Sequence, residues 1–567
     1  MVEATNQICN ITISLLVAHG IKHVVLSPGS RNAPLIVAVA KEKSLNKVVI
    51  VDERTAAFVA LGLATSTNGK EPVALICTSG TALLNYSPAI AEAYYRNLPL
   101  IVISADRPYE WIDQDDSQTL NQFEALSKFV KKSYNLPPLC QTKNQEWYVN
   151  RIVNDAIITS NSGKKGPIHL NIQLDEPLSQ YIGEYLDSPR IISMPSTQPF
   201  FDSTFFDNII NEKRINQKRV LIIAGFQNCD NESWSTTLSD KLDEILESNP
   251  NFTLLTESIS NINSKKAICN IDRNLCNLNK DRNFDISPDI VITFGGALIS
   301  RFIKQYLREN KSIEHWHIGL TDTTIDCFQS LTYRINTLPY VFFSLLNESI
   351  KGINSDIDYQ KQWNDLVTFS KHKHNKYVQN CEWSDLKAFS IFLPLLKGNL
   401  HLSNGTPIRY HQLFDKNPNI NKIYCNRGVS GIDGSTSTAI GFALNSSETT
   451  YLVTGDLSAQ YDISAFSINN IPPSFKMIVM NNGGGGIFRF IKSTSQLMEL
   501  EEYFATKPNL PLKSLAEGYN FTYFEANNEK ELLDIFPKFN EVTNKPAILA
   551  INTPSLTSAN ILSNYFK

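Results

Sequence analysis

The sequence lacks the features that mark several specialised classes of protein. No run of roughly 18 or more apolar residues is present, and residues 1–10 lack the basic stretch and apolar core of a signal peptide. We therefore expect no membrane span and no secretion, with the cytoplasm as the location. The charge is nearly balanced, because Lys and Arg number 52 against 56 Asp and Glu, a net charge of -4. This balance gives no reason to expect a nucleic-acid partner.

Two recognisable short motifs are also missing. Nine cysteines are spread from Cys9 to Cys425, and none forms a C-x-x-C pair. An odd number without ligand spacing predicts reduced, mostly buried thiols instead of disulfides or a zinc site. No G-x-G-x-x-G follows a predicted strand, and the strand at Arg219–Ile223 leads only into Ala224-Gly225-Phe226. These absences argue against a nicotinamide-dependent dehydrogenase.

The pattern that is present indicates an α/β protein. A chain of 567 residues is too long for one hydrophobic core, and we expect three domains, at residues 1–185, 190–350 and 380–567. Short β-rich runs alternate with segments of helical spacing, which predicts a mainly parallel sheet flanked by helices in each domain. A Pro- and Ser-containing stretch at 191–200 and a polar, Lys- and His-rich stretch at 371–376 are the expected connections.

The predicted elements fall into three groups. The strands are His23–Leu26, Lys47–Val51, Val73–Cys77 and Leu100–Ser104, then Arg219–Ile223, Phe252–Thr256 and Asp289–Phe294, then Lys422–Cys425, Thr450–Thr454, Phe475–Met480 and Ala547–Ile551. The clearest helices are Ala33–Lys43, Arg54–Thr65 and Ala82–Tyr95. No short repeat links the groups, so they resemble one another in pattern only.

Polar and glycine-containing motifs follow the predicted strands of the first and third domains. In an open parallel sheet, ligands bind beyond the carboxyl ends of the strands, where the N–H groups of helix N-termini point outward. The motifs are Ser27 to Arg31, Asp52 to Arg54, Thr78 to Thr81, Ala105 to Arg107, Asn426 to Gly434, Gly455 to Ser458 and Asn481 to Phe488. Two domains therefore each carry a candidate ligand-binding edge.

The most specific of these motifs are Gly455-Asp456 and Asn481-Asn482, each directly after a strand. Their carboxylate and amide oxygens suit a hard cation such as Mg²⁺, which is held by few protein ligands together with phosphate oxygens. The four glycines that follow, Gly483 to Gly486, allow the backbone to approach that ion and a diphosphate closely. The alternative is that Asp456 caps a helix and the glycines form a flexible turn. The pairing of the two motifs favours the metal site.

The motifs together resemble those of thiamin-diphosphate-dependent enzymes. The G-D and N-N pair is similar to the diphosphate and metal motif of that superfamily, with Leu457 at the position of its usual third glycine. Within the superfamily, the chain resembles the 2-succinyl-5-enolpyruvyl-6-hydroxy-3-cyclohexene-1-carboxylate synthases of menaquinone biosynthesis. The segments that carry this resemblance are SPGSRNAPL (Ser27 to Leu35), VDERTAAF (Val51 to Phe58), TSGTA (Thr78 to Ala82), ADRP (Ala105 to Pro108), NRGVSGIDG (Asn426 to Gly434) and GDLSAQYD (Gly455 to Asp462).

The resemblance implies the cofactor site. Residues 1–185 would bind the aminopyrimidine ring and residues 380–567 the diphosphate and metal, Mg²⁺ or also Mn²⁺. Glu53 matches the glutamate that hydrogen-bonds the aminopyrimidine ring; judged alone, its position also fits a helix N-cap. Metal ligands would be Asp456, Asn482 and the carbonyl of Gly484, and Ile432 matches the apolar residue that keeps the cofactor bent. The remaining cofactor-binding residues would be Thr81, Gly455, Leu457, Ser458, Gly485 and Ile487.

The resemblance also implies the substrates. Arginines bind carboxylates bidentately, and several of them fit an active site for 2-oxoglutarate and isochorismate, both dicarboxylates. The residues carried over as catalytic are Glu53, Ser30, Arg31, Arg107, Asn121, Gln122, Arg409 and Arg427, with Ser30 also placed as a helix-start residue. A basic pair of some relatives reads Ser300-Arg301 here, so only Arg301 is carried over.

The implied reaction is a decarboxylating transfer. 2-Oxoglutarate would lose CO₂, and the resulting succinyl carbanion equivalent would add in conjugate fashion to isochorismate. The enzyme would be a homodimer or homotetramer with active sites at the dimer interface, without a nucleic-acid or membrane partner. Two alternatives stay open: a 2-keto acid decarboxylase or ligase similar to acetohydroxyacid synthase, which a FAD requirement would favour, and a relative that binds without turnover, against which Glu53, Asp456 and Asn482 count.

Overall fold

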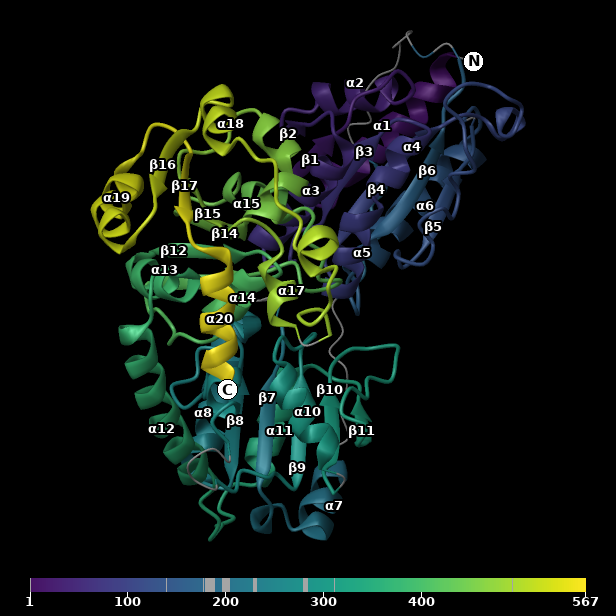
Figure 1. Cartoon of the computed structure of the whole chain (residues 1–567). Helices are drawn as coiled ribbons and strands as arrows, with labels where there is room; N and C mark the ends of the chain where they lie inside the picture. Colours follow the sequence, from purple (N-terminus) through teal and green to yellow (C-terminus); the bar gives the residue numbers. More distant parts are fainter. Residues whose placement is uncertain are drawn as a thin grey trace. The chain divides into compact units, whose positions relative to one another are not determined.

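The computed structural model describes residues 2–138, 140–176, 178, 189–195, 204–227, 232–278, 284–310, 312–491 and 493–567. It contains three parallel sheets of five or six strands, flanked by helices (Figure 1). The strands in the middle of each sheet are almost entirely buried, which explains their continuous apolar runs, whereas exposed and half-buried positions lie mainly in strands at the sheet edges. The predicted fold class, α/β with three mainly parallel sheets, is confirmed.

The first sheet has the strand order β2-β1-β3-β4-β6-β5. Its strands are β1 (His23–Leu26), β2 (Asn46–Val49), β3 (Val73–Cys77), β4 (Leu100–Asp106), β5 (Ser133–Leu136) and β6 (Ile168–Gln173). Its helices are α1 (Val2–Ala18), α2 (Ala33–Lys41), α3 (Glu53–Ser66), α4 (Thr81–Asn85), α5 (Ser87–Arg96) and α6 (Lys143–Asn161).

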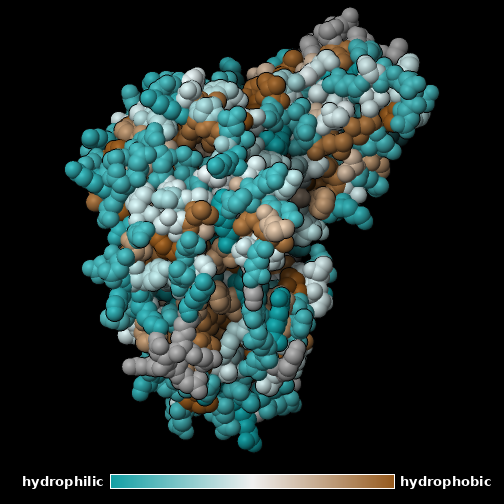
Figure 2. Space-filling model, in the orientation of Figure 1, coloured by the Kyte–Doolittle hydropathy of each residue, from teal (hydrophilic) through white to brown (hydrophobic). Residues whose placement is uncertain are grey.

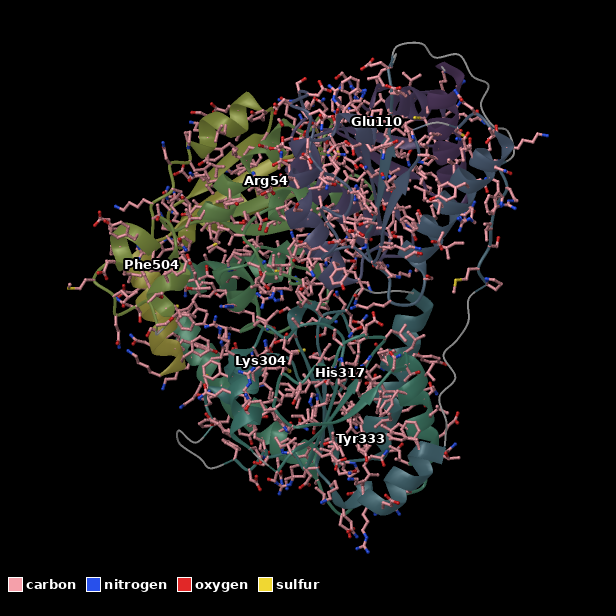
Figure 3. All side chains as sticks on the ribbon, turned by 90° about the vertical axis from the view of Figure 1, so that its right-hand side faces the viewer. Arg54, Glu110, Lys304, His317, Tyr333 and Phe504 are labelled. Atoms are coloured by element: carbon pink, nitrogen blue, oxygen red, sulfur yellow. The ribbon has the colours of Figure 1, made fainter. Side chains whose placement is uncertain are left out.

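The central sheet has the order β11-β10-β9-β7-β8. Its strands are β7 (Val220–Ala224), β8 (Phe252–Thr256), β9 (Ile290–Phe294), β10 (Glu314–Ile318) and β11 (Leu331–Ile335). Neighbouring strands β10 and β11 carry His317 and Tyr333, which are labelled in Figure 3. The helices around it are α7 (Thr204–Lys213), α8 (Glu232–Ser248), α9 (Ile271–Leu275), α10 (Arg301–Glu309), α11 (Pro339–Ser349) and α12 (Tyr359–Asn380).

The third sheet has the order β13-β12-β14-β15-β17-β16, which repeats the topology of the first sheet strand for strand. The similarity in pattern without similarity in sequence therefore extends to the strand order. The strands are β12 (Gly398–Leu402), β13 (Ile420–Tyr424), β14 (Thr450–Gly455), β15 (Phe475–Asn481), β16 (Thr522–Ala526) and β17 (Ala547–Asn552). The helices are α13 (Asp385–Phe392), α14 (Thr406–His411), α15 (Ser435–Ala443), α16 (Asp456–Tyr461), α17 (Gly486–Phe490), α18 (Leu512–Gly518), α19 (Glu529–Glu541) and α20 (Ser555–Phe566).

The chain forms two compact units. One comprises residues 1–197, 426–450 and 461–475, and the other comprises 198–425, 451–460 and 476–567. Segments of the third sequence region therefore belong to both units. The three domain boundaries drawn from the sequence stay a prediction, and the stretch proposed as a boundary at 191–200 lies partly outside the described residues.

The polar stretch at 371–376, predicted as a connection, is instead part of α12, and that prediction is wrong. One face of α12 is buried, and its residues recur at helical spacing: Tyr359, Trp363, Leu366, Ser370, His374 and Val378. The charged residues of the stretch lie on the other face. Another predicted helix, Ala82–Tyr95, is two helices, because α4 ends at Asn85 and α5 begins at Ser87, followed by Pro88.

Helices α3 and α15, which are equivalent in the first and third sheets, pack closely within one unit. A Cβ atom on Gly62 would lie 2.1 Å from the carbonyl oxygen of Thr438, and one on Gly441 would lie 2.2 Å from that of Val59. Only glycine lets the two backbones approach so closely. At the start of α15, Gly434 packs against the ring of Phe58. The contact therefore fixes the N-terminal ends of both helices, where Glu53 and the 426–434 loop lie.

We expect Gly62→Ala to destabilise the protein. Alanine favours a helix over glycine by ~1 kcal/mol, but its methyl group overlaps backbone atoms that cannot move aside. Overpacking should lower the free energy of unfolding by roughly 1–3 kcal/mol, measured from urea denaturation. Gly518→Ala is the control, because Gly518 also lies in a helix, as the last residue of α18, and has no neighbour within 4 Å. Equal stability of the two variants would show that the α3–α15 contact is looser than described.

The visible surface is mixed in character. On the face drawn in Figure 2, apolar residues form small groups among hydrophilic ones. No helix among the described residues has the length and apolar character needed to cross a membrane.

Candidate active site

The loop after β1 is held by hydrogen bonds between its own residues. Asn32 accepts a hydrogen bond from the N–H of Gly29 at 2.9 Å and donates one to the carbonyl of Ser27 at 2.9 Å. Helix α2 begins at Ala33 with Asn32 before it, so the prediction that Ser30 starts the helix is wrong. Ser30 is exposed, whereas Arg31 beside it is buried. The loop therefore presents a hydroxyl outward and a guanidinium inward.

Glu53 is the first residue of α3, but it does not cap that helix. Asp52 is the N-cap, and its carboxylate accepts from the N–H of Thr55 at 3.1 Å. Glu53 is half-buried. Burial raises the pKa of the Cys77 thiol, at the end of β3, and the charge of Glu53 raises it further. The cap interpretation of Glu53 is therefore wrong, and its carboxylate is available for another role.

Arg54, labelled in Figure 3, joins α3 to the segment that starts at Tyr461. Its guanidinium lies over the ring of Tyr461, 4.9 Å from the centroid, and donates to the carbonyl of that residue at 2.9 Å. The next residue, Asp462, accepts from both the N–H and the hydroxyl of Ser437 at 2.7 Å. Burial raises the pKa of Asp462 to about 6. These contacts hold the first turn of α15 against the start of α3.

The loop at 426–434 is held by two buried charged residues of α5. The carboxylate of Glu92 accepts from the N–H groups of Gly428 at 2.8 Å and Val429 at 2.7 Å, and Arg96 donates to the side chain of Asn426 at 3.3 Å. Burial raises the pKa of Glu92, which these N–H groups oppose. Arg427 is half-buried and Ile432 is 39 % exposed in this fixed loop. The role of Glu92 has no local signal in the sequence, because its partners lie 336 and 337 residues away along the chain.

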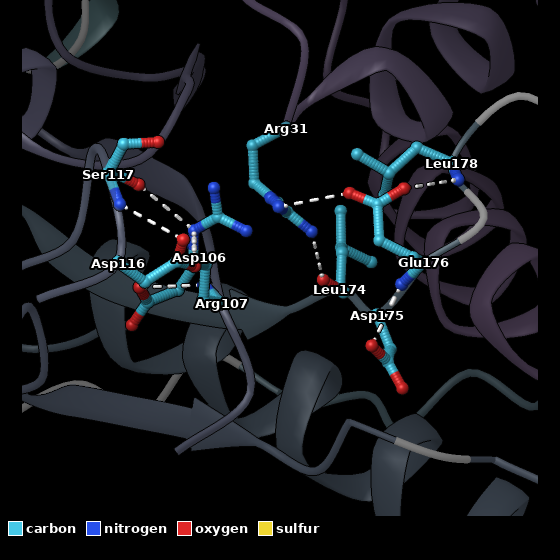
Figure 4. A network of polar contacts seen from close by, with 9 residues as sticks. All are labelled: Arg31, Asp106, Arg107, Asp116, Ser117, Leu174, Asp175, Glu176 and Leu178. Atoms are coloured by element: carbon cyan, nitrogen blue, oxygen red, sulfur yellow. Dashed lines mark hydrogen bonds and ion pairs between the residues drawn. The ribbon is translucent and has the colours of Figure 1, made fainter. Parts of the chain in front are cut away.

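Arg31 and Arg107 form one polar network beyond β4 and β6 (Figure 4). Arg31 donates to the carbonyl of Leu174 at 2.9 Å and lies 3.1 Å from the carboxylate of Glu176. Arg107 lies 2.9 Å from the carboxylate of Asp116. The buried Asp106, whose pKa burial raises to about 6, accepts from the N–H of Arg107. Two arginines that were separate in the sequence analysis therefore belong to one cluster.

The adjacent residues Asn121 and Gln122 differ in their surroundings. Asn121 is exposed, whereas the buried amide of Gln122 accepts from the N–H of Gly80 at 2.6 Å and donates to Ala105 and Asn171 at 3.0 Å. Asn171 also donates to Asp106 at 2.8 Å. This network places the turn before Thr81, which is exposed at the start of α4, relative to Arg107. Asn171, on β6, had no distinguishing signal in the sequence.

Asp456 lies at the end of β14 in a cradle of backbone N–H groups. One carboxylate oxygen accepts from Gly483 at 2.8 Å and Gly484 at 2.9 Å, and the other accepts from Leu457 at 2.7 Å. The side chain is buried, and burial raises its pKa although the N–H groups oppose that rise. The carboxylate thus fixes the start of the glycine run, as expected if the two motifs act together.

A second buried carboxylate orients Asn482. Its side-chain amide donates to the carboxylate of Asp385 at 2.8 Å, and that carboxylate also accepts from the hydroxyl of Thr553. The backbone N–H of Asp385 donates to the hydroxyl oxygen of Ser558 at 3.0 Å. With the nitrogen held, the amide oxygen of Asn482 is the atom that can bind a cation. Burial raises the pKa of Asp385, and the charge of Asp456 also raises it. Asp385 was not identified from the sequence, because it begins α13 nearly a hundred residues before Asn482.

The glycine run makes close contact with its own chain. Cβ atoms on Gly484 and Gly485 would lie 2.1 Å from the carbonyl oxygen of Thr506 and 2.8 Å from that of Phe504. Gly483, at φ +79, has open space beside it. The need for glycine at two of the four positions is therefore explained by the 504–506 segment. Nearby, Ile487 lies on α17, Ser458 is buried on α16, and Gly455 ends β14.

Arg409, on α14, lies in a second charged cluster. Burial raises the pKa of Asp272, and the positive charges of Arg409, Lys304 and Arg301 oppose the rise. The hydroxyl of Ser300 donates to Asp272, and the N–H groups of Ile299 and Ser300 donate to the buried Glu257, each at 2.7 Å. Arg301 and Arg409 are therefore electrostatic neighbours of one carboxylate.

A cavity of about 780 Å³ lies elsewhere, lined by residues of α12 and α20. None of the predicted site residues lines it.

Among the described residues, no group of three or more His, Cys, Asp or Glu side chains is arranged to hold a metal. All eight described cysteines are free thiols, five of them buried, in agreement with the sequence analysis.

Comparison with known proteins places the chain in a family. The model described as "Thiamine pyrophosphate enzyme, N-terminal TPP binding domain" matches residues 7–125, so this part of the chain is a binding domain for thiamin diphosphate. The chain is 37 % identical to the 2-succinyl-5-enolpyruvyl-6-hydroxy-3-cyclohexene-1-carboxylate synthase of Porphyromonas gingivalis, over 98 % of this chain and 96 % of that protein. Identity is 38 % to the synthase of Flavobacterium psychrophilum, over 100 % and 98 %. The chain therefore belongs to the 2-succinyl-5-enolpyruvyl-6-hydroxy-3-cyclohexene-1-carboxylate synthase family.

Proposed function

We propose that this protein decarboxylates 2-oxoglutarate and adds the succinyl unit in conjugate fashion to isochorismate. The products are 2-succinyl-5-enolpyruvyl-6-hydroxy-3-cyclohexene-1-carboxylate and CO₂, a step of menaquinone biosynthesis. The observation that carries the proposal is identity of 37–38 % over almost the whole chain to synthases named for this product. When bound, thiamin diphosphate supplies the electron sink for decarboxylation.

The residues around Asp456 fit a divalent cation and the diphosphate it carries. Asp456 offers a carboxylate, Asn482 an amide oxygen fixed by Asp385, and Gly484 a backbone carbonyl. A set of hard oxygen ligands with few protein donors suits Mg²⁺, and also Mn²⁺. Gly455, Leu457, Ser458, Gly485 and Ile487 surround this set in sequence and complete the proposed diphosphate site.

The roles of the other residues follow from their chemistry. Glu53 holds a proton at the aminopyrimidine ring. Its carboxylate can take this role because Asp52, and not Glu53, caps α3. Thr81 and the bulky side chain of Ile432 position the same cofactor. The guanidinium groups of Arg31, Arg107, Arg409 and Arg427 bind substrate carboxylates, with Ser30 and Asn121 as exposed polar partners and Gln122 holding the turn before Thr81.

We further propose that each active site is shared by two copies of the chain, in a homodimer or a homotetramer. Glu53 would come from one subunit and Asp456 from the other. Large apolar side chains around the first-unit motifs support the need for a partner: Val51 is 78 % exposed and Val429 is 56 % exposed. Isologous pairing around a twofold axis would cover two such sets at once.

A donor and acceptor assay tests the proposed reaction. The purified protein with thiamin diphosphate and Mg²⁺ should release CO₂ from 2-oxoglutarate. It should form the conjugate product only when isochorismate is also present. Pyruvate should be a poor donor, because it has only one carboxylate and would leave arginine side chains that bind the second carboxylate of 2-oxoglutarate without a partner. Efficient turnover of pyruvate, particularly with a FAD requirement, would instead support the enzyme type similar to acetohydroxyacid synthase. No turnover of any 2-keto acid would support a non-catalytic relative.

A further inference from the structure

The protein's own carboxylates contact Arg31 and Arg107 in different ways. Figure 4 shows the guanidinium groups of Arg31 and Arg107 facing each other, with Glu176 and Asp116 on their outer sides. Guanidinium groups take a carboxylate through the two terminal nitrogens or through Nε and one terminal nitrogen. Which nitrogen the protein already uses therefore decides what a substrate can reach.

Asp116 uses the inner nitrogen of Arg107. Its carboxylate lies 2.9 Å from Nε, and Nε also donates to the carbonyl of Ser117 at 3.1 Å. The other oxygen of Asp116 accepts from the N–H of Ser117 at 3.0 Å, which fixes the carboxylate. The terminal nitrogens of Arg107 form no hydrogen bond or ion pair with a described residue, and one of them lies on the side of Arg31 (Figure 4). Asp116 therefore aims Arg107 without occupying its binding end.

Glu176 uses a terminal nitrogen of Arg31. Nη1 donates to the carbonyl of Leu174, and Nη2 lies 3.1 Å from Oε1 of Glu176. The side chain of Arg31 is only 6 % exposed, whereas that of Glu176 is 63 % exposed. Burial lowers the pKa of Arg31 and the charge of Arg107 lowers it further, while Glu176 opposes this. A buried guanidinium beside a second one needs an anion, and Glu176 is the exposed group that supplies it.

We propose that Glu176 is a resident carboxylate that occupies Arg31 until a substrate carboxylate replaces it, while Asp116 is a positioning residue for Arg107. The proposal rests on the proposed function and identifies the ligand class of this cluster as dicarboxylates. A ligand carboxylate between the two guanidinium groups would take Nη2 of Arg31 together with a terminal nitrogen of Arg107. The Glu176 side chain can move into solvent, because an ion pair with one exposed partner is weak and screened by salt.

Opposite effects of two similar substitutions test this assignment. Glutarate, a dicarboxylate that cannot be decarboxylated as a 2-keto acid, is titrated by calorimetry into protein saturated with thiamin diphosphate and Mg²⁺. Glu176→Gln should lower the glutarate Kd by about two- to fivefold, the range typical of a lost exposed ion pair. Asp116→Asn should raise it at least about twofold, since Arg107 is no longer aimed. The KM for 2-oxoglutarate should follow the same two directions.

Asp175→Asn is the matched control for charge. Asp175 precedes Glu176 and acts on Arg31 only electrostatically, and an asparagine can still accept from the N–H of Glu176. If Glu176 occupies the arginine, Glu176→Gln should improve binding clearly more than Asp175→Asn does. Equal improvement in both variants, or weaker binding by Glu176→Gln, would overturn the proposal. Raised salt should reduce the difference between Glu176→Gln and the unsubstituted protein.

A third variant separates this proposal from the proposed function. Arg31→Gln should weaken glutarate binding and raise the KM for 2-oxoglutarate. If it does so while Glu176→Gln changes nothing, Glu176 has only a structural role and the function stands. If Arg31→Gln leaves both quantities unchanged, substrate carboxylates bind elsewhere, and the roles proposed for this cluster and for Glu176 both fail.

Discussion

Replacing Glu53 with glutamine should reduce turnover by at least ~10²-fold while leaving the protein folded. The amide could not hold or release the proton that, in the proposed role, the carboxylate shares with the aminopyrimidine ring. Stability should change little, because Asp52, not Glu53, caps α3. Initial rates of CO₂ release from 2-oxoglutarate, with saturating cofactor, metal and isochorismate, measure the effect.

Asp52→Ala provides the reverse control for Glu53→Gln. Loss of an N-cap typically costs 0.5–2 kcal/mol, so this variant should lower the urea midpoint, with turnover falling only as far as unfolding requires. The comparison separates chemistry from helix stability at neighbouring positions. Near-normal turnover in Glu53→Gln would show that the cofactor is activated by another group.

Replacing Asp456 with alanine should abolish Mg²⁺-dependent binding of thiamin diphosphate. We expect a loss of at least ~10²-fold in affinity, because even partners behind metal ligands are worth about 10- to 100-fold. The variant removes both the proposed ligand and the acceptor for the N–H groups of Gly483 and Gly484. Calorimetric titration with the cofactor at several Mg²⁺ concentrations measures it, and circular dichroism checks that the protein without cofactor is folded.

Asp385→Asn is a graded companion to the Asp456 variant. It keeps the size of the side chain that holds Asn482 but removes its charge, so cofactor affinity should fall less than in Asp456→Ala. Unchanged affinity in Asp456→Ala would mean that the diphosphate is anchored elsewhere. In that case the cradle around Asp456 has only a structural role.

The sequence predicts strands far better than it predicts connections between distant residues. The predicted strand Val73–Cys77 matches the observed one to the residue, because a strand buried on both faces is an uninterrupted apolar run between polar residues. The helix at Tyr359–Asn380 was missed in part, because its charged residues conceal a buried face repeated every three or four positions. The composition of residues 371–376 alone favours a connection, but the packing of the buried face makes the segment part of a helix.

The residues of the candidate site likewise fall into those that the sequence predicts and those that it does not. Asp456 and Asn482 could be found because they directly follow strands, where chain direction alone brings side chains to one edge. Asp385, which orients Asn482, and Glu92, which holds the 428–429 backbone, carry no local signal. Their roles come from contacts across 97 and 336 residues. Such partners are defined by packing, and a single sequence does not contain that information.

We propose that Glu53 and Asp456 act on the same cofactor from two copies of the chain. Co-expression of Glu53→Gln and Asp456→Ala chains with two different tags, followed by double purification, yields the mixed oligomer. Each parent should be inactive, whereas a mixed dimer regains one site with both residues intact. We predict up to about half of the activity of the unsubstituted dimer, because the two sites are equivalent by symmetry. A doubly tagged dimer as inactive as its parents would contradict the shared site.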